Sequence, residues 1–571
     1  MTIQSDREWC VRACRWLPAI AGVAALLSLV PEALSPGPYF YDQNYCLQAA
    51  VRLAHGQGLT GCSDHEPPPL DVATPVYSRL YWWAPGYSVM VAGLLRLGVP
   101  LPLAASLIKI VAYIGGWVAG AALARRGVPD GNWLLLFLMA VLPFARIVPL
   151  YSQSDVLVWA IIPLWMLAAM NIWSRMRDSA RLRDVAVPVC TLGLLTAAAI
   201  MFRWASMFLA PAAVVCIVLG AYHYRRPWLL PTLATLALAL GPYKLVLLSN
   251  AAATGHSGSQ GDDIIGAHAW SLRGLLTDEP LLGLLGRPSG VYDLLASVSS
   301  SVARHGSDLL AIPLLAAMAW ALVRVLRRTP GGLEPRPGLW VAVAVAYGTM
   351  CAMLLAATPG ARLLVDSGAY GIFEPRYYTL LSLPALLLAV QLVACAQRRG
   401  AALQRRWRLV AAACACVLVA SGLWAAKSQF GGLVKLPFRY GIAPLQVRQA
   451  PERVVVDREI ARQSAKRVML FAERANRFLP EDTIPAYFPP SLERIPSLHA
   501  SRPTLLFVVL DTAPAEETRR HARCYPPSVE IIRRFHLHEV SDQSLTDTGV
   551  YCGVVAPRLE PVPGETRDAV P

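Results

Sequence analysis

Long apolar segments recur along the chain and alternate with short clusters of basic residues. The first covers residues 17–34, and ten more follow at 103–124, 133–150, 155–173, 185–202, 206–222, 227–249, 308–325, 339–357, 378–396 and 409–426. Each has roughly the 17–25 residues that a helix needs to cross a bilayer. The pattern predicts a mainly α-helical, polytopic membrane protein with about 11 transmembrane helices.

The basic clusters indicate the orientation of these helices. They lie at 125–126, 175–183, 225–226, 324–328 and 398–408, at alternate ends of the predicted helices. Because cytoplasmic loops carry the excess of Lys and Arg, we predict that this side faces the cytoplasm. The apolar segment at 86–98 is too short for a typical span. Counting it as one would also place every later basic cluster on the opposite side of the membrane. We therefore expect an interfacial or re-entrant helix there, on the outer face.

The same topology divides the chain into two domains. Residues 1–426 form the predicted transmembrane domain, including a first outer loop at 35–102, and residues 427–571 form a C-terminal domain outside the cytoplasm. The tail has a helix-like stretch at 459–478 and strand-like stretches at 505–510 (LLFVVL) and 550–555 (VYCGVV). These patterns predict a soluble α/β domain of ordinary size.

Composition and cysteine placement narrow the class of protein. The chain is 55% hydrophobic and only 16% charged, whereas a soluble protein is about a quarter charged. The net charge of +15 comes from clusters beside apolar segments, so we predict no nucleic-acid partner. No Cys or His set has zinc spacing. Cys46 with Cys62, and Cys524 with Cys552, would suit disulfides in an oxidising compartment.

Five cations occupy unexpected places in or beside the apolar segments. They are Lys109, Arg146, Arg203, Lys244 and Arg376, all in the outer halves or at the outer ends of predicted helices. A cation in a transmembrane helix is costly and usually faces a cavity or a partner. Any one of them could simply extend to the outer headgroups. Five on the same side indicate an anionic ligand, for which a lipid phosphate is the natural candidate.

Two carboxylates map to the same outer face. Asp42 follows the first apolar segment, and Asp155 begins the fourth. A carboxylate beside a cationic pocket can act as general base on an acceptor hydroxyl. The structural alternative is helix capping, by Asp155 in the sequence YSQSD and by Asp42 or Asn44 in the first loop.

A third group of polar residues stands in the sequence FEPRYY. Pro375 prevents a helix from continuing through it, which would hold Glu374, Arg376 and Tyr377 at the outer end of the next span. Arg376 could bind a phosphate, or it could form only an exposed ion pair with Glu374, which would contribute little. The chain has no Walker A, GxGxxG or GxSxG motif, so ATP hydrolysis and serine-hydrolase chemistry have no support.

The order of these motifs resembles a known superfamily. An acid in the first outer loop is followed by A-x-x-L-x-x-G-x-G, Pro-Gly-Tyr, Leu-Ala-Arg-Arg, Y-S-x-x-D and P-R-Y, here at Asp42, Ala50 to Gly58, Pro85 to Tyr87, 123–126, 151–155 and 375–377. Over the first 400 residues or so the chain is similar to the GT-C polytopic glycosyltransferases. It looks most like bacterial members related to protein O-mannosyltransferases and lipid A aminoarabinose transferase.

The resemblance implies a polyprenyl-phosphate sugar donor, transfer on the outer face and inversion at the anomeric carbon. It implies Asp42 as general base and a catalytic role for Asp155 in positioning acceptor or sugar. We predict lipid-phosphate contacts at Arg203, Lys244, Arg376 and Lys109, and other substrate contacts at Glu374, Tyr377 and Tyr87. Many relatives have two adjacent acids in the first loop, whereas this chain has Asp42 followed by Gln43. The C-terminal tail is only loosely similar to the outer domains of those relatives.

We therefore predict a glycosyltransferase of the cell envelope, in the bacterial inner membrane, with its active site and C-terminal domain on the periplasmic side. Its partners would be the lipid-linked donor, membrane lipids, and a glycan, lipid or protein acceptor, with a divalent cation optional. The main alternative is a transporter or a lipid or sugar flippase, which would place polar groups near the membrane midplane and show repeated halves. A non-catalytic assembly subunit is a third interpretation.

Overall fold

A computed structural model describes residues 41–62, 69–80, 83–127, 153–179, 181–254, 451–464, 467–472, 485–487, 489–511, 525–540, 545 and 548–557. The chain separates into two compact units. The first, here called the helical unit, comprises Met1–Ser35, Tyr81–Tyr87 and Ala105–Leu445. The second, here called the mixed unit, comprises Pro36–Leu80, Ser88–Ala104 and Gln446–Pro571. The predicted division at residue 426 stays a prediction.

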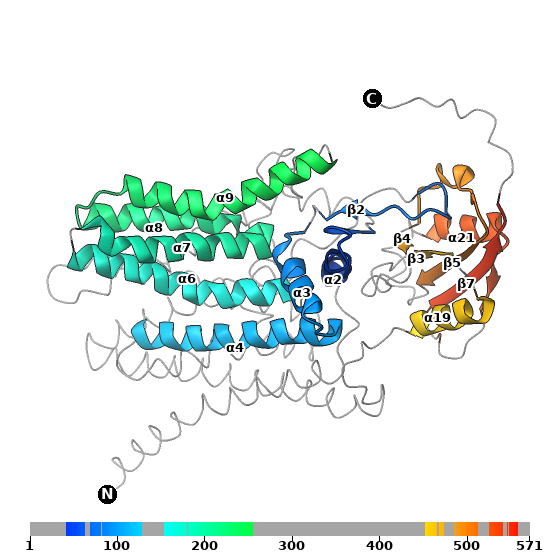
Figure 1. Cartoon of the computed structure of the whole chain (residues 1–571), viewed down its shortest axis with the longest axis horizontal. Helices are drawn as coiled ribbons and strands as arrows, with labels where there is room; N and C mark the ends of the chain where they lie inside the picture. Colours follow the sequence, from blue (N-terminus) through cyan, green and yellow to red (C-terminus); the bar gives the residue numbers. More distant parts are fainter. Residues whose placement is uncertain are drawn as a thin grey trace, which may run out of the picture. The chain divides into compact units, whose positions relative to one another are not determined.

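The described part of the helical unit is a bundle of long apolar helices (Figure 1). Its helices are α4 (Leu101–Gly127), α6 (Gln153–Asp178), α7 (Leu182–Phe202), α8 (Leu209–His223) and α9 (Leu229–Thr254). Four of these described helices, α4, α6, α7 and α9, are long and apolar enough to cross a membrane. They confirm the segments expected at 103–124, 155–173, 185–202 and 227–249. The segments expected at 17–34, 133–150 and from 308 to 426 lie outside the described residues, so the count of about 11 stays a prediction.

Helix α7 is the centre of this bundle, since it packs against both α6 and α9. A buried hydrogen bond ties α7 to α6, in which Trp165 Nε1 donates to Thr196 Oγ1 at 3.0 Å. The Thr196 hydroxyl in turn donates to Leu192 O at 2.7 Å, within its own helix. Paired polar groups of this kind join helices where apolar burial gives no preference, because lipid is as apolar as the helix surface.

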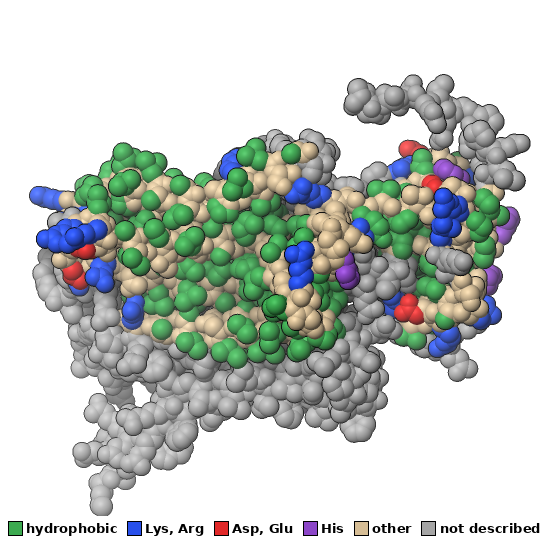
Figure 2. All heavy atoms as spheres, in the orientation of Figure 1, with side chains coloured by type: hydrophobic (Ala, Val, Ile, Leu, Met, Phe, Trp, Pro, Cys, Tyr) green, Lys and Arg blue, Asp and Glu red, His purple; other side chains and the backbone are tan. Residues whose placement is uncertain are grey.

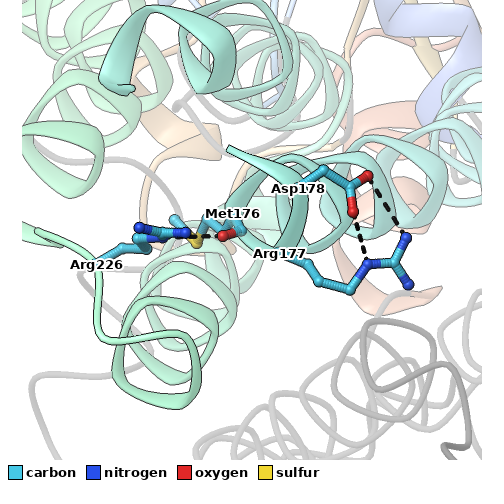
Figure 3. A network of polar contacts seen from close by, with 4 residues as sticks. All are labelled: Met176, Arg177, Asp178 and Arg226. Carbon is cyan, nitrogen blue, oxygen red and sulfur yellow. Dashed lines mark hydrogen bonds and ion pairs between the residues drawn. The ribbon is translucent and has the colours of Figure 1, made fainter. Parts of the chain in front are cut away.

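One end of the bundle carries two of the predicted basic clusters. At the end of α6, Arg177 forms an exposed ion pair with Asp178 at 2.7 Å, and Arg226 Nε donates to Met176 O at 3.0 Å (Figure 3). Arg226 precedes α9, so the clusters at 175–183 and 225–226 lie at the same end of the helices, as the alternation predicts. Figure 2 shows Lys and Arg side chains gathered beyond the apolar surface at this end.

The helix expected at 206–222 differs at its start. Residues Trp204–Phe208 form a 3₁₀-helix, η2, and α8 begins only at Leu209. Arg203 has an extended backbone, with φ −156° and ψ 119°, which ends α7. Pro211 lies in the first turn of α8, where its missing N–H is tolerated. The extended backbone of Arg203 therefore separates α7 from η2.

The C-terminal part of the mixed unit is a five-stranded mixed sheet in the order β4-β3-β5-β7-β6. The strands are β3 (Val468–Ala472), β4 (Ala486–Tyr487), β5 (Thr504–Asp511), β6 (His538–Glu539) and β7 (Thr548–Val555). Strand β3 pairs parallel with β4 and β5, whereas β7 pairs antiparallel with β5 and β6. Helices α19 (Pro451–Gln463) and α21 (Tyr525–Arg534) pack against this sheet. The α/β expectation and both predicted strands are confirmed.

The helix expected at 459–478 is wrong. Helix α19 ends at Gln463, and the next described residues after the turn form β3. Ser464 has a positive φ of 47°, a left-handed conformation that commonly ends a helix. The following VMLFA sequence is buried at four of its five positions. A continuous apolar run of this length is typical of a strand that is buried on both faces.

The described part of the predicted first outer loop begins with α2 (Tyr41–Ala54). A short hairpin of β1 (Thr60–Gly61) and β2 (Ser78–Arg79) follows. The glycines of the A-x-x-L-x-x-G-x-G motif form the turn after α2. Gly56 and Gly58 have φ of 79° and 80°, a backbone that side chains rarely adopt. Helix α3 (Gly86–Arg96) confirms the short helix expected at 86–98. Its Arg96 Nη2 donates to Leu53 O at 2.9 Å and so caps α2.

Within the mixed unit, the first loop and the C-terminal sheet are joined directly. The Tyr487 hydroxyl donates to Val76 O at 2.6 Å and accepts from Val76 N at 2.8 Å. Asp71 forms a β-bridge with His499. These contacts join segments about four hundred residues apart in the sequence.

Asp71 is held as a carboxylate by this junction. Partial burial alone would raise the pKa of its carboxyl. The hydrogen bonds from Ser501, Ala73 and Thr74 outweigh that effect and lower the pKa to about 2. Its Oδ1 accepts from Ser501 N at 2.9 Å and from Ala73 N at 3.0 Å.

The disulfide that Cys46 and Cys62 would suit is not formed in this structure, where both side chains are buried thiols. Instead, Cys62 N donates to Gln48 Oε1 at 2.8 Å, which fixes the segment after the hairpin strand to α2. Cys552 is also free, and it lies 3.4 Å from His538 Nε2. Its expected partner Cys524 lies outside the described residues.

Candidate functional site

A buried ion pair at one end of the helical unit joins two of the predicted site residues. Asp155 lies in the first turn of α6, and Arg203 directly follows α7. The Arg203 guanidinium contacts the Asp155 carboxylate, and their side chains are only 12% and 8% exposed. Asp155 is therefore neither a simple N-cap, since α6 begins two residues earlier, nor a solvated acid.

The local fold explains how Arg203 reaches α6. Its extended backbone ends α7, while its N–H still donates to Ala199 O at 2.9 Å. Its carbonyl accepts from Ser206 N at 2.9 Å and starts η2. Arg203 is thus fixed on both sides by the backbone. A buried ion pair contributes little to stability compared with well-packed apolar residues, so a gain in folding stability does not by itself explain this pair.

Helices α4 and α6 run in the same direction, and this places Lys109 relative to the pair. The rings of Tyr113 and Trp159 stack at 5.7 Å between centroids, and near the other end Arg126 Nη1 donates to Asn171 Oδ1 at 2.8 Å. From the first contact to the second, the residue numbers rise in both helices, so the two helices are parallel. Lys109 and Asp155 each lie four residues before the stacked rings, so they lie about one turn further toward the same end. Lys109 is 1% exposed.

The close approach of α4 and α6 depends on a glycine. A Cβ added at Gly116 would lie 2.5 Å from the Trp159 ring and 2.9 Å from Ala160 Cα. Small residues allow such approach between membrane helices. This contact fixes how far along the helix axes Lys109 lies relative to Asp155.

The Pro-Gly-Tyr motif also meets this site. A Cβ at Gly86 would lie 2.6 Å from Met201 O, in the last turn of α7. The start of α3 therefore packs directly against the helix end that presents Arg203. Tyr87, the next residue, is buried with 1% exposure.

Two neutral donors, which the sequence analysis did not assign, lie in η2. Trp204 Nε1 and Ser206 Oγ are buried, and neither has a hydrogen-bond partner within the described structure. The signal available in the sequence is only an indole and a hydroxyl directly after an unexpected arginine at a helix end. Neither residue type is unusual there.

Comparison with solved structures supports the helical architecture. The chain is similar to ArnT from Cupriavidus metallidurans, with a TM-score of 0.50 and 12% identity over 96% of this chain and 98% of that chain. A structure of ArnT from the same organism bound to undecaprenyl phosphate gives 0.50 and 12% over 94% and 97%. The archaeal oligosaccharyltransferase AglB from Archaeoglobus fulgidus, in complex with an inhibitory peptide and a dolichol-phosphate, gives 0.45 and 9% over 96% and 75%. No family model and no curated protein matches the sequence.

The similarity to ArnT extends over nearly the full length of both chains. The chain shares the fold of ArnT. This agrees with the GT-C fold that the order of the sequence motifs predicts, and at this identity the similarity shows the fold alone.

Within the GT-C fold, the predicted site residues have different outcomes. Asp155, Arg203 and Lys109 gather at one end of the helical unit. Lys244 lies on α9 and is exposed. Asp42 is the second residue of α2, and its side chain lies outside the described part. Asn44 is not a cap, because it lies inside α2 and is 1% exposed.

Four predicted residues of the outer face fall outside the described ranges, namely Arg146, Glu374, Arg376 and Tyr377. Their placement in the GT-C fold stays a prediction. Among the residues that are described, no group of three or more His, Cys, Asp or Glu side chains could hold a metal ion.

Proposed function

We propose that this chain is a membrane glycosyltransferase that takes a sugar from a polyprenyl-phosphate carrier and transfers it to an acceptor on the non-cytoplasmic face. The observation that carries the proposal is the buried pair of Asp155 and Arg203, with buried Lys109 at the same level of the helical unit. A GT-C fold adds support, since ArnT with this fold has been obtained with undecaprenyl phosphate bound.

The charges fit the chemistry of a phosphate leaving group. Arg203 and Lys109 bring two cations to a region shielded from water, where they attract an anion more strongly than in water. Cations held in place before reaction stabilise the charge that develops on a departing phosphate. Lys244, and Arg376 from the later outer loop, would add to this charge at the phosphate.

The transfer would be a single displacement. The acceptor hydroxyl attacks the anomeric carbon, the bond from that carbon to the phosphate oxygen breaks, and polyprenyl phosphate leaves with the electron pair. The hydroxyl proton passes to Asp42 as general base. Attack opposite the leaving group inverts the anomeric centre.

Arg203 would serve both the phosphate and Asp155. A guanidinium has five N–H donors in a planar fork, so contact with one carboxylate leaves donors for a second oxygen ligand. Asp155, oriented by Arg203, would position the acceptor or the sugar. Glu374, Tyr377 and Tyr87 are proposed to make further substrate contacts.

The test uses purified protein in lipid nanodiscs with a panel of undecaprenyl-phosphate sugars and glycan, lipid and protein acceptors. Wild type should transfer at least one sugar, and Asp42→Asn should lower the rate by roughly 10²–10⁴-fold, the usual loss for a general base. Asp178→Asn is the matched control, since Asp178 is an exposed acid at the other end of α6. Equal rates for wild type and Asp42→Asn would remove Asp42 as the base. Transfer from no donor would favour a transporter or flippase.

A further inference from the structure

The 3₁₀-helix η2 presents two hydrogen-bond donors that the described protein leaves unused. Trp204 Nε1 and Ser206 Oγ are both buried and have no hydrogen-bond partner among the described residues, and Ser206 as a whole is only 6% exposed. Buried donors in native structures are almost always paired. Two unpaired donors, two residues apart in one turn, therefore indicate a bound group that accepts hydrogen bonds.

The indole is held in place by α9. Its ring packs edge-on against Tyr243, with centroids 5.3 Å apart and planes at 66°. It also packs on the apolar cluster of Ile200, Tyr243 and Leu247. The backbone of η2 is fixed at its start, where Ser206 N donates to Arg203 O. The donors are thus preorganised, so a ligand would not need to reorient them.

Arg203 and Trp204 contact different neighbours of α7. Arg203 contacts Asp155 on α6, whereas Trp204 contacts Tyr243 on α9. The buried ion pair lies on the α6 side, whereas the described contacts of Trp204 on the α9 side are with the Tyr243 ring and the apolar cluster around it. Lys244 is also on α9, but it is exposed and does not belong to this buried contact.

We propose that Trp204 and Ser206 bind the sugar of the lipid-linked donor, through hydrogen bonds from the indole N–H and the hydroxyl to sugar oxygens. Tyr243 supports the indole from α9. This inference rests on the proposed function and divides the site into a phosphate-binding part and a sugar-binding part. The cations hold the phosphate, while neutral donors and aromatic rings, which suit an uncharged polyhydroxyl group, hold the sugar.

The test compares binding of two lipids, one with a sugar and one without. Trp204→Phe removes the N–H and keeps an aromatic ring against Tyr243, and Ser206→Ala removes only the hydroxyl. In nanodiscs, dissociation constants are measured for the undecaprenyl-phosphate sugar that wild type binds best, and for undecaprenyl phosphate alone. Each variant should weaken the sugar-bearing lipid about 5- to 10-fold, the usual effect of one hydrogen bond, and leave undecaprenyl phosphate unchanged.

Trp165→Phe is the matched control, because it also removes a buried indole N–H, but one that donates to Thr196 inside the protein. It should lower the melting temperature without changing the ratio of the two dissociation constants. If Trp204→Phe folds poorly, the binding comparison is made with Ser206→Ala alone, because this substitution removes only one hydroxyl group.

The outcomes separate this inference from the proposed function. Equal weakening of both lipids would assign the donors to the phosphate, and unchanged binding of both would make them structural; either result overturns the inference. If wild type binds no sugar-bearing lipid, the proposed function itself is wrong. If wild type binds and transfers while the variants bind normally, only the inference is wrong.

Discussion

Gly86 offers the most direct test of how the helical unit positions its charged pair. Its Cα faces the last turn of α7, so that an added Cβ would lie 2.6 Å from Met201 O and 2.9 Å from both Met201 C and Phe202 Cδ1. Two of these three neighbours are backbone atoms, which cannot rotate away as a side chain would. The next residue along α7 is Arg203. Gly86→Ala therefore pushes on the segment that carries the arginine.

The size of the effect follows from the distances. The contact with Met201 O falls about 0.8 Å short of the 3.4 Å at which ordinary van der Waals contact begins. Adding a methyl group to a packed interior typically costs about 1–3 kcal/mol. A displacement of about 1 Å in a group that orients reactants can cost on the order of 10²-fold in rate. We therefore expect a moderate loss of stability and a larger loss of activity.

The assay measures melting temperature and transfer rate for Gly86→Ala beside Gly93→Ala. Gly93 lies in the same helix α3, and an added Cβ there meets nothing within 4 Å. Alanine is favoured over glycine inside a helix by roughly 0.5–1 kcal/mol, so Gly93→Ala should match or slightly exceed wild type in stability. The comparison holds the chemical change constant and varies only the contact.

Two results would refute this reasoning. Gly86→Ala with wild-type stability and rate would mean that the start of α3 does not constrain α7. Equal losses for Gly86→Ala and Gly93→Ala would mean that the helix responds to any methyl group, whatever lies opposite.

Two further predictions concern charged groups. Asp155→Asn and Arg203→Gln should each lower stability by about 3–5 kcal/mol, because each removes one partner of a buried ion pair. The double variant should lose less than the sum in a thermal-unfolding cycle. Removing the exposed pair of Arg177 and Asp178 should leave the melting temperature nearly unchanged (Figure 3). Additive losses at the buried pair would contradict the coupling. Asp71 has a lowered pKa, so it stabilises the fold fully above about pH 4 and progressively less as pH falls toward 2. Asp71→Asn should therefore lower stability by about 1 kcal/mol at pH 7, discounted for its exposure, and the difference from wild type should shrink below pH 4. A constant difference across that range would show that ionisation of Asp71 is not involved.

The apolar pattern predicted the described helices well because the membrane imposes a single rule on all of them. A backbone in lipid must satisfy its own hydrogen bonds, so length and composition suffice to locate α6 or α7. The pattern failed where that rule does not apply. The break at Arg203 and the left-handed Ser464 after α19 depend on single backbone conformations, which composition does not report.

The candidate site was predictable in its charges and not in its pairing. Lys109, Asp155 and Arg203 stand out because a charge in an apolar segment needs a reason. Which of them meet depends on the register of α4, α6 and α7, and glycine contacts such as that of Gly116 set this register. Trp204 was not identifiable, since tryptophan is common near the ends of membrane helices. Its significance comes only from an unpaired N–H that the folded structure reveals.

Several independent constraints meet at the end of α7. Helix α6 contributes the partner of Arg203, α3 packs at Gly86 against the preceding turn, and η2 begins with a hydrogen bond to the Arg203 carbonyl. Two features of this region are not efficient ways to stabilise a helix bundle. A buried ion pair is often no better than apolar packing, and the unpaired donors of η2 are unfavourable without a ligand. A chain selected for stability alone would replace them with apolar residues. Their presence together is explained if the end of α7 is shaped for a polar, oxygen-rich ligand that completes its hydrogen bonds.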